Sequence, residues 1–124
     1  MSVRHVRALR GAITVAEDDP ESIRDATQEL IDELLHVNLL NQDDVISAFF
    51  TVTNDLHSEF PAHGARLLGW GDVPMVCTQE VAVDGALERC IRVMLHVYTW
   101  RARASLKHVY LRDAIMLRPD LGME

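Results

Sequence analysis

The sequence predicts a mixed α+β domain in which helices cover one face of a β-sheet. Residues 90–98 alternate apolar and other side chains at period two, whereas residues 20–35 carry apolar side chains at helical spacing. Further β-rich segments are separated by helical ones without strict βαβ alternation. Because one helical layer leaves another face or edge of a five-stranded sheet to cover, we expect a homo-oligomer.

The strand predicted at 90–98 carries an arginine in a mostly apolar stretch. One face carries Ile91, Val93, Leu95 and Val97, and the other carries Cys90, Arg92, Met94, His96 and Tyr98. An unpaired guanidinium there would have a heavy desolvation cost, so an anionic group must meet Arg92. Arginine grips a carboxylate with two parallel hydrogen bonds, and we therefore expect a small anionic ligand.

The N-terminal segment Val3–Val15 is predicted to form another strand. Gly11 within it indicates a bulge or a close backbone approach. Arg7 and Arg10 fall on opposite faces at period two unless a bulge intervenes. We expect only one of these arginines to reach a ligand.

The long helix begins at Asp19-Pro20, where proline suits the first helical position, and its apolar residues continue at helical spacing to Leu35. Asn41-Gln42-Asp43-Asp44 opens a short helix through Ile46, and the β-rich residues 48–53 then form a strand. Residues 61–68 form a second short helix, which Gly69 closes.

The C-terminal half is predicted to contain three strands. The first spans Val73–Val83 and ends at the turn Asp84-Gly85, after which residues 86–89 lead into the strand that carries Arg92. The last spans Lys107–Leu117, before the breaker Pro119.

Composition limits the class of protein. A chain of 124 residues with 48% hydrophobic content is expected to form a single domain, residues 1–124. A net charge of −7 and the lack of a basic stripe argue against nucleic-acid binding. The first residues lack a signal-peptide pattern and no apolar run is long enough to span a membrane, so we expect a cytoplasmic protein. Cys77 and Cys90, without CxxC spacing, suit reduced buried thiols.

Common catalytic motifs are missing from the sequence. The six histidines form no HExxH, HxH or Cys/His cluster, and neither a GxSxG motif nor a glycine-rich phosphate loop occurs. We therefore expect no metal and no cofactor.

Cys77 and Glu80 lie three residues apart in a predicted strand and should point to opposite faces. One interpretation is a core cysteine and a solvated edge charge. The other is a strand that runs along a subunit boundary in a cyclic oligomer and serves two pockets. Tyr110 also has two interpretations, as a half-buried aromatic residue or as a ligand contact.

Short motifs along the chain resemble the AroH-type, monofunctional trimeric chorismate mutases. They are Arg10-Gly11-Ala12-Ile13-Thr14-Val15, Phe60-Pro61-Ala62, Cys77-Thr78-Gln79-Glu80, Cys90-Ile91-Arg92-Val93-Met94, His108-Val109-Tyr110-Leu111 and Leu117-Arg118-Pro119-Asp120-Leu121. The resemblance runs from about Val6 to Leu121 with the motifs in order. It implies a pseudo-α/β-barrel homotrimer with active sites between subunits and the rearrangement of chorismate to prephenate without a cofactor.

The resemblance also implies roles for individual residues. Arg92 would donate to the ether oxygen of the substrate, Glu80 would accept from the ring hydroxyl, and Arg10 would hold a carboxylate. Matches to substrate-binding, pocket-lining or entrance positions are Tyr110, Cys77, Phe60, Ala62, Arg66, Leu117, His63 and Val76. His63 stands where relatives often carry lysine, and Val76 where threonine is common.

Two other functions fit an arginine-lined cleft. One is a trimeric imine deaminase of the RidA type, which also uses an interfacial arginine for a carboxylate. The other is a non-enzymatic sensor of a small anionic metabolite. Turnover of chorismate would distinguish the mutase from both.

Overall fold

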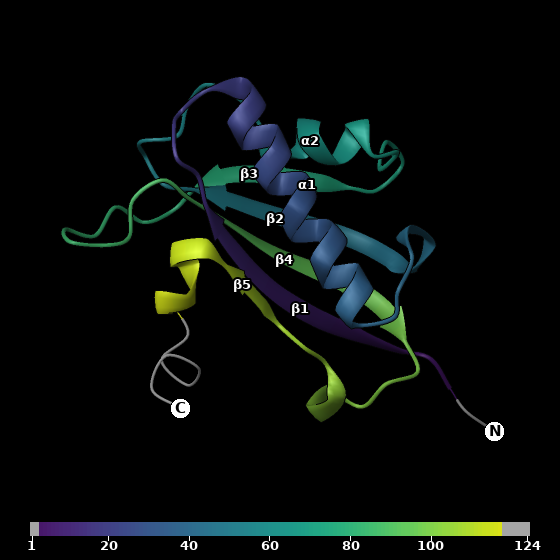
Figure 1. The fold of residues 1–124 in the computed structure, drawn as a ribbon. Coiled ribbons are helices and arrows are strands. Elements are labelled where there is room, and N and C mark those ends of the chain that lie inside the picture. The colour runs from purple at the N-terminus through teal and green to yellow at the C-terminus, as the bar shows by residue number, and fades with distance from the viewer. Residues whose placement is uncertain (1–2, 118–124) are drawn as a thin grey trace.

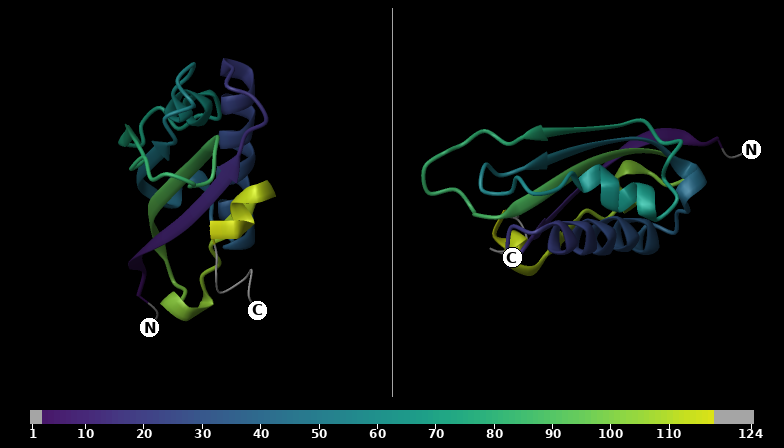
Figure 2. Two further views of the ribbon diagram at one scale, coloured as in Figure 1. Left: turned by 90° about the vertical axis from the view of Figure 1, so that its left-hand side faces the viewer. Right: turned by 90° about the horizontal axis from the view of Figure 1, so that it is seen from above.

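The computed structural model describes residues 3–117, which form one five-stranded sheet with helices on one face (Figure 1). The strands are β1 (His5–Thr14), β2 (Val45–Val52), β3 (Met75–Gln79), β4 (Cys90–Thr99) and β5 (Val109–Leu111), in the spatial order β3-β2-β4-β1-β5. Helices α1 (Pro20–Val37) and α2 (Pro61–Leu67) lie on the same side of the sheet, as Figure 2 shows from above. The predicted mixed α+β fold with helices on one face is confirmed.

Strand β4 lies at the centre of the sheet. It pairs antiparallel with β1 on one side and with β2 on the other, whereas the edge strands β3 and β5 run parallel to β2 and β1. Its alternation follows the predicted pattern, since Ile91, Val93, Leu95 and Val97 are at most 4% exposed. These side chains pack in the core beneath α1.

Helix α1 covers the sheet through its apolar stripe. The Asp19 carboxylate caps its N-terminus, accepting from the Ser22 N–H at 2.8 Å, and Pro20 occupies the first turn as predicted. The helix approaches β1 closely at Gly11, where a Cβ atom would lie 2.9 Å from Leu34 Cδ1 and 3.1 Å from the Val109 carbonyl oxygen. Gly11 therefore marks a close approach, and no bulge interrupts β1 there.

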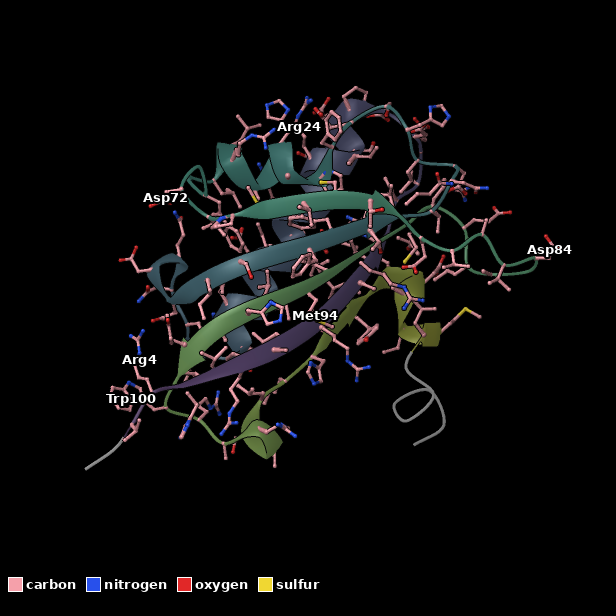
Figure 3. All side chains as sticks on the ribbon, turned by 180° about the vertical axis from the view of Figure 1, so that it is seen from behind. Arg4, Arg24, Asp72, Asp84, Met94 and Trp100 are labelled. Carbon is pink, nitrogen blue, oxygen red and sulfur yellow. The ribbon has the colours of Figure 1, made fainter. Side chains whose placement is uncertain are left out.

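The opposite face of the sheet is not covered by either helix (Figure 3). It carries large apolar side chains that are 39–56% exposed: Val6, Phe49, Val76, Met94 and Tyr98. Met94 lies near the middle of this face in Figure 3. We call this surface the bare sheet face.

Several predicted boundaries are wrong. The helix predicted at 41–46 is a single 3₁₀ turn, Gln42–Asp44. Strand β2 begins directly after it, because Val45 already pairs with β4 in the sheet. The strand predicted at 73–83 is shorter, because its pairing with β2 ends at Gln79 and the chain then leaves the sheet as a loop.

The strand predicted at 107–117 is also largely wrong. Only Val109–Leu111 pairs with β1, and Arg112–Leu117 form a 3₁₀ helix. Arg112 turns the chain with a φ of 56° and donates from Nη1 to the Thr14 carbonyl at 2.9 Å. This long-range contact at the end of β1 overrides the local β-propensity.

Glu59 ties the two helices together. Its Oε2 accepts from Arg24 Nη1 of α1 at 2.7 Å and lies 2.9 Å from His63 Nδ1 of α2. The hydrogen bonds from His63 and then Arg24 lower the pKa of the Glu59 carboxyl to about 2.

Substituting Gly11→Ala should destabilise the protein by about 1–3 kcal/mol, because the new methyl group meets α1 and a backbone carbonyl. Gly71→Ala is the matched control, since a Cβ atom added there would have no neighbour within 4 Å, and it should change stability by less than about 0.5 kcal/mol. Urea unfolding at one fixed protein concentration measures both. Equal stability of the two variants would contradict the close packing at Gly11.

The lowered pKa of Glu59 predicts a pH-dependent contribution to folding. A carboxyl with a depressed pKa stabilises the fold above its ordinary pKa, near 4.5, and loses this effect as the pH falls through about 2. The gap in unfolding free energy between wild type and Glu59→Gln should therefore narrow as the pH falls from about 5.5 to about 2.

The control for that experiment is Glu29→Gln, which removes an exposed partner of Arg112. It should change the unfolding free energy by less than about 0.5 kcal/mol at each pH. A gap between wild type and Glu59→Gln that stayed constant with pH would show that Glu59 carries no such linkage.

Candidate functional site

Arg92 projects from β4 onto the bare sheet face, away from the helices. Its Nε lies 3.3 Å from Oε2 of Glu80, which directly follows β3, and the two side chains are 47% and 30% exposed. The anionic group that the sequence required beside Arg92 is therefore Glu80. This single contact through Nε leaves the two terminal nitrogens of the guanidinium for a ligand.

Strand register sets a row of residues across the sheet at this level. Thr51 of β2 pairs with Arg92, Arg92 pairs with Ala12 of β1, and Ala12 pairs with Tyr110 of β5. Ala12 lies between Arg92 and Tyr110 in this row and is fully buried, packed with Cys90 and Ala114. Arg10 pairs with Met94 one step along the ladder, so Arg10 and Arg92 are diagonal neighbours on one face.

The predicted separation of Arg7 from Arg10 is confirmed. Arg10 is exposed on the bare sheet face, and its backbone N–H donates to His108 Nδ1 at 2.9 Å. Arg7 is half-buried, on the other face of β1, and donates from Nε to the Arg101 carbonyl at 3.5 Å. Only Arg10 shares the face that carries Arg92.

A cavity of about 230 Å³ opens beside Arg92. Its lining includes Arg92, Glu80 and Leu117 from the predicted set, together with Thr53, Val81, Val83, Ala86, Leu87 and Cys90. Tyr110 and Leu117 pack against a small buried cluster of Ala12, Cys90 and Ala114 at its edge. We call this cavity the arginine half-site.

Cys77 and Glu80 point to opposite faces of the sheet, as predicted. Cys77 packs against the main core on the helix side and faces the backbone N–H of Ala62 in α2. With Phe60 it lines a second cavity, of about 260 Å³, whose other lining residues are Val52, Leu56, His57, Ser58, Glu59, Pro61 and Thr78. We call this cavity the Phe60 half-site.

The remaining predicted residues line neither of these two cavities. Ala62 is 5% exposed and packs in the core, whereas Arg66 is exposed on α2 close enough to act electrostatically on Cys77. The His63 ring is engaged by Glu59, with 2.9 Å between Nδ1 and Oε2. Val76 is 52% exposed on the bare sheet face, where its neighbour across the ladder is Phe49.

Sequence reasoning missed Thr51. Its Oγ1 donates to Glu80 Oε2 at 2.8 Å, the same oxygen that Arg92 Nε approaches. The residue type carries no local signal for this contact, because it depends on how β2 aligns with both β3 and β4. The register between these strands was the only information that could have identified it.

The thiols of the site are neutral side chains. Burial raises the pKa of Cys90 to about 11, and burial also raises the pKa of Cys77. Both cysteines are unpaired, as expected, and neither has the lowered pKa of a reactive thiol. The charged side chains described at this site are the cations Arg92 and Arg10 and the carboxylate of Glu80.

Residues 3–117 contain no group of three or more His, Cys, Asp or Glu side chains placed to hold a metal ion. Neither α1 nor α2, nor any other helix within that range, is long and apolar enough to cross a membrane.

Comparisons with known proteins identify the family of this chain. The family model for chorismate mutase type I matches residues 6–121. Chorismate mutase AroH of Thermus thermophilus is 47% identical over 117 residues, which cover 94% of this chain and 96% of that protein. Chorismate mutase AroH of Bacillus subtilis is 41% identical over 119 residues, covering 95% and 94%.

The fold also matches a solved structure. The chorismate mutase from Clostridium thermocellum superposes with a TM-score of 0.87 at 45% identity, over 89% of this chain and 98% of that one. These matches give no support to the deaminase or sensor alternatives. The chain therefore belongs to the type I chorismate mutases.

Proposed function

We propose that this chorismate mutase rearranges chorismate to prephenate at a site completed between subunits, with Arg92 as the principal catalytic residue. The observation that carries this proposal is the Arg92–Glu80 pair, which puts a cation and an acceptor side by side in the lining of one cavity.

The reaction is a concerted rearrangement in which the ether C–O bond breaks while a C–C bond forms. It requires no nucleophile, because bond breaking and bond making occur within one molecule. An acceleration of about a millionfold corresponds to about 8 kcal/mol, which must come from holding a reactive conformer and from electrostatics.

Arg92 can supply the electrostatic part. Negative charge develops on the ether oxygen as the C–O bond breaks, and a fixed guanidinium stabilises that charge in the transition state more than in the ground state. The ion pair of Nε with Glu80 restrains the guanidinium on one side, and its terminal nitrogens face the substrate in this proposal. Glu80 then accepts from the ring hydroxyl, and Arg10 and Tyr110 hold a carboxylate of the substrate.

The split between the two half-sites supports a homotrimer. Phe60 and Cys77 open a cavity on one side of β3, whereas Arg92 and Glu80 open another on the other side. In a cyclic oligomer the Phe60 half-site of one subunit can close the arginine half-site of the next. The bare sheet face, with Phe49 and Met94 half-exposed, is the apolar surface that such an assembly would bury.

Covering Arg92 would also strengthen its action. A guanidinium that is 47% exposed in a single chain is screened by water, and a neighbouring subunit would remove that water. In this proposal Leu117 lines the arginine half-site. The family resemblance alone assigns Ala62, Arg66, His63 and Val76 to pocket or entrance positions of the assembled site.

We place the reaction in the cytoplasm, in the synthesis of phenylalanine and tyrosine. The two unpaired cysteines support a reducing compartment.

The direct test is incubation of the purified protein with chorismate, with prephenate identified by NMR. Wild type should form prephenate, and Arg92→Ala should not. A folded wild type that leaves chorismate unchanged would refute the proposed function, and full activity of Arg92→Ala would remove Arg92 from the reaction.

Replacing Arg92→Lys tests the shape of the cation. Lysine keeps the charge but lacks the planar fork, so kcat should fall by about 10²-fold or more. The oligomer should remain intact, since lysine keeps a positive charge beside Glu80. Sedimentation measures assembly beside the kinetics, and near-wild-type kcat would contradict the assignment.

A further inference from the structure

One oxygen of the Glu80 carboxylate accepts a hydrogen bond and also forms an ion pair. Thr51 Oγ1 donates to Oε2 at 2.8 Å, and Arg92 Nε lies 3.3 Å from the same atom. The other oxygen, Oε1, accepts no hydrogen bond from any residue in 3–117 that the structure records. Glu80 therefore presents one occupied oxygen and one open oxygen.

Strand β2 holds Glu80 at two points. The backbone N–H of Glu80 donates to the Val52 carbonyl at 2.7 Å, which fixes the main chain just beyond β3. The adjacent residue on β2, Thr51, then fixes the side chain. Because Thr51 also pairs with Arg92 in the ladder, it lies between the acid and the cation.

We infer that Thr51 is a positioning residue for this site, an inference that rests on the proposed function. By occupying Oε2, the hydroxyl keeps Glu80 in single-point contact with Arg92. Without it the carboxylate can rotate toward the two-point fork that arginine and carboxylates favour. That fork would occupy a guanidinium N–H that the ether oxygen needs and would turn Oε1 away from the ring hydroxyl.

The substitution Thr51→Val keeps the branched shape and removes only the hydroxyl. Loss of one hydrogen bond to a charged group should lower kcat about tenfold, whereas KM should change less than about threefold. Thr51→Ser restores the hydroxyl and should return kcat to within about threefold of wild type. Rescue by serine separates the hydroxyl from simple packing.

The matched control is Ser47→Ala. Ser47 also lies on β2, and its hydroxyl pairs with His96 Nδ1 at 3.2 Å, away from Glu80. This variant should keep the kcat and KM of wild type. If kcat fell as much in Ser47→Ala as in Thr51→Val, removing any hydroxyl from β2 would lower kcat, and the inference would be wrong.

A double-mutant cycle tests whether Thr51 acts through Glu80. In a Glu80→Gln background, Thr51→Val should lower kcat by less than about twofold, because the carboxylate it orients is gone. The same tenfold loss in both backgrounds would overturn the inference. So would a Thr51→Val protein with unchanged kcat.

A measurement without substrate separates this inference from the proposed function. The Nε–H resonance of Arg92 in ¹⁵N spectra should shift in Thr51→Val and stay in place in Ser47→Ala. If wild type forms no prephenate while this resonance shifts in Thr51→Val, the proposed function is wrong, but Thr51 still positions the Arg92–Glu80 pair. An unmoved resonance in Thr51→Val would refute the positioning role itself.

Discussion

The two-residue period of β4 is the constraint on which the rest of the structure depends. Every second side chain of this central strand is buried under the helices, so Arg92 must project to the opposite face. A slip by one residue would bury the guanidinium and expose the core. The ten residue pairs between β1 and β4 fix the register against such a slip. Hydrophobic burial thereby orients the charged group.

The end of β3 divides the candidate site into two halves. The same alternation sends Cys77 toward α2 and Glu80 toward Arg92, so one chain carries two separate cavities. The bare sheet face beside them carries five large apolar side chains that are 39–56% exposed, which is typical of a surface that binds another protein. The proposed trimer would account for the two cavities and for the exposed apolar face, since it would join unlike half-sites and cover the sheet.

The sequence predicted the elements that depend on neighbouring residues, such as the alternation of a strand and the start of a helix. The period of residues 90–98 and the Asp19-Pro20 start of α1 both appear in the structure. The strand expected at 107–117 is wrong over most of its length, because Arg112 turns the chain and donates to the carbonyl of Thr14, which is distant in sequence. Thr51 was missed for a similar reason, since strand register arises only when β2, β3 and β4 assemble.

The most direct test of the shared site is activity of mixed oligomers made from two inactive variants. Arg92→Ala removes the cation of one half-site, and Phe60→Glu puts a repelling charge on the other, at a side chain that is 66% exposed. Coexpressed in equal amounts, they should recover about a quarter of wild-type activity, because some interfaces join two unaltered halves. A mixture as inactive as its components would contradict a site shared between subunits.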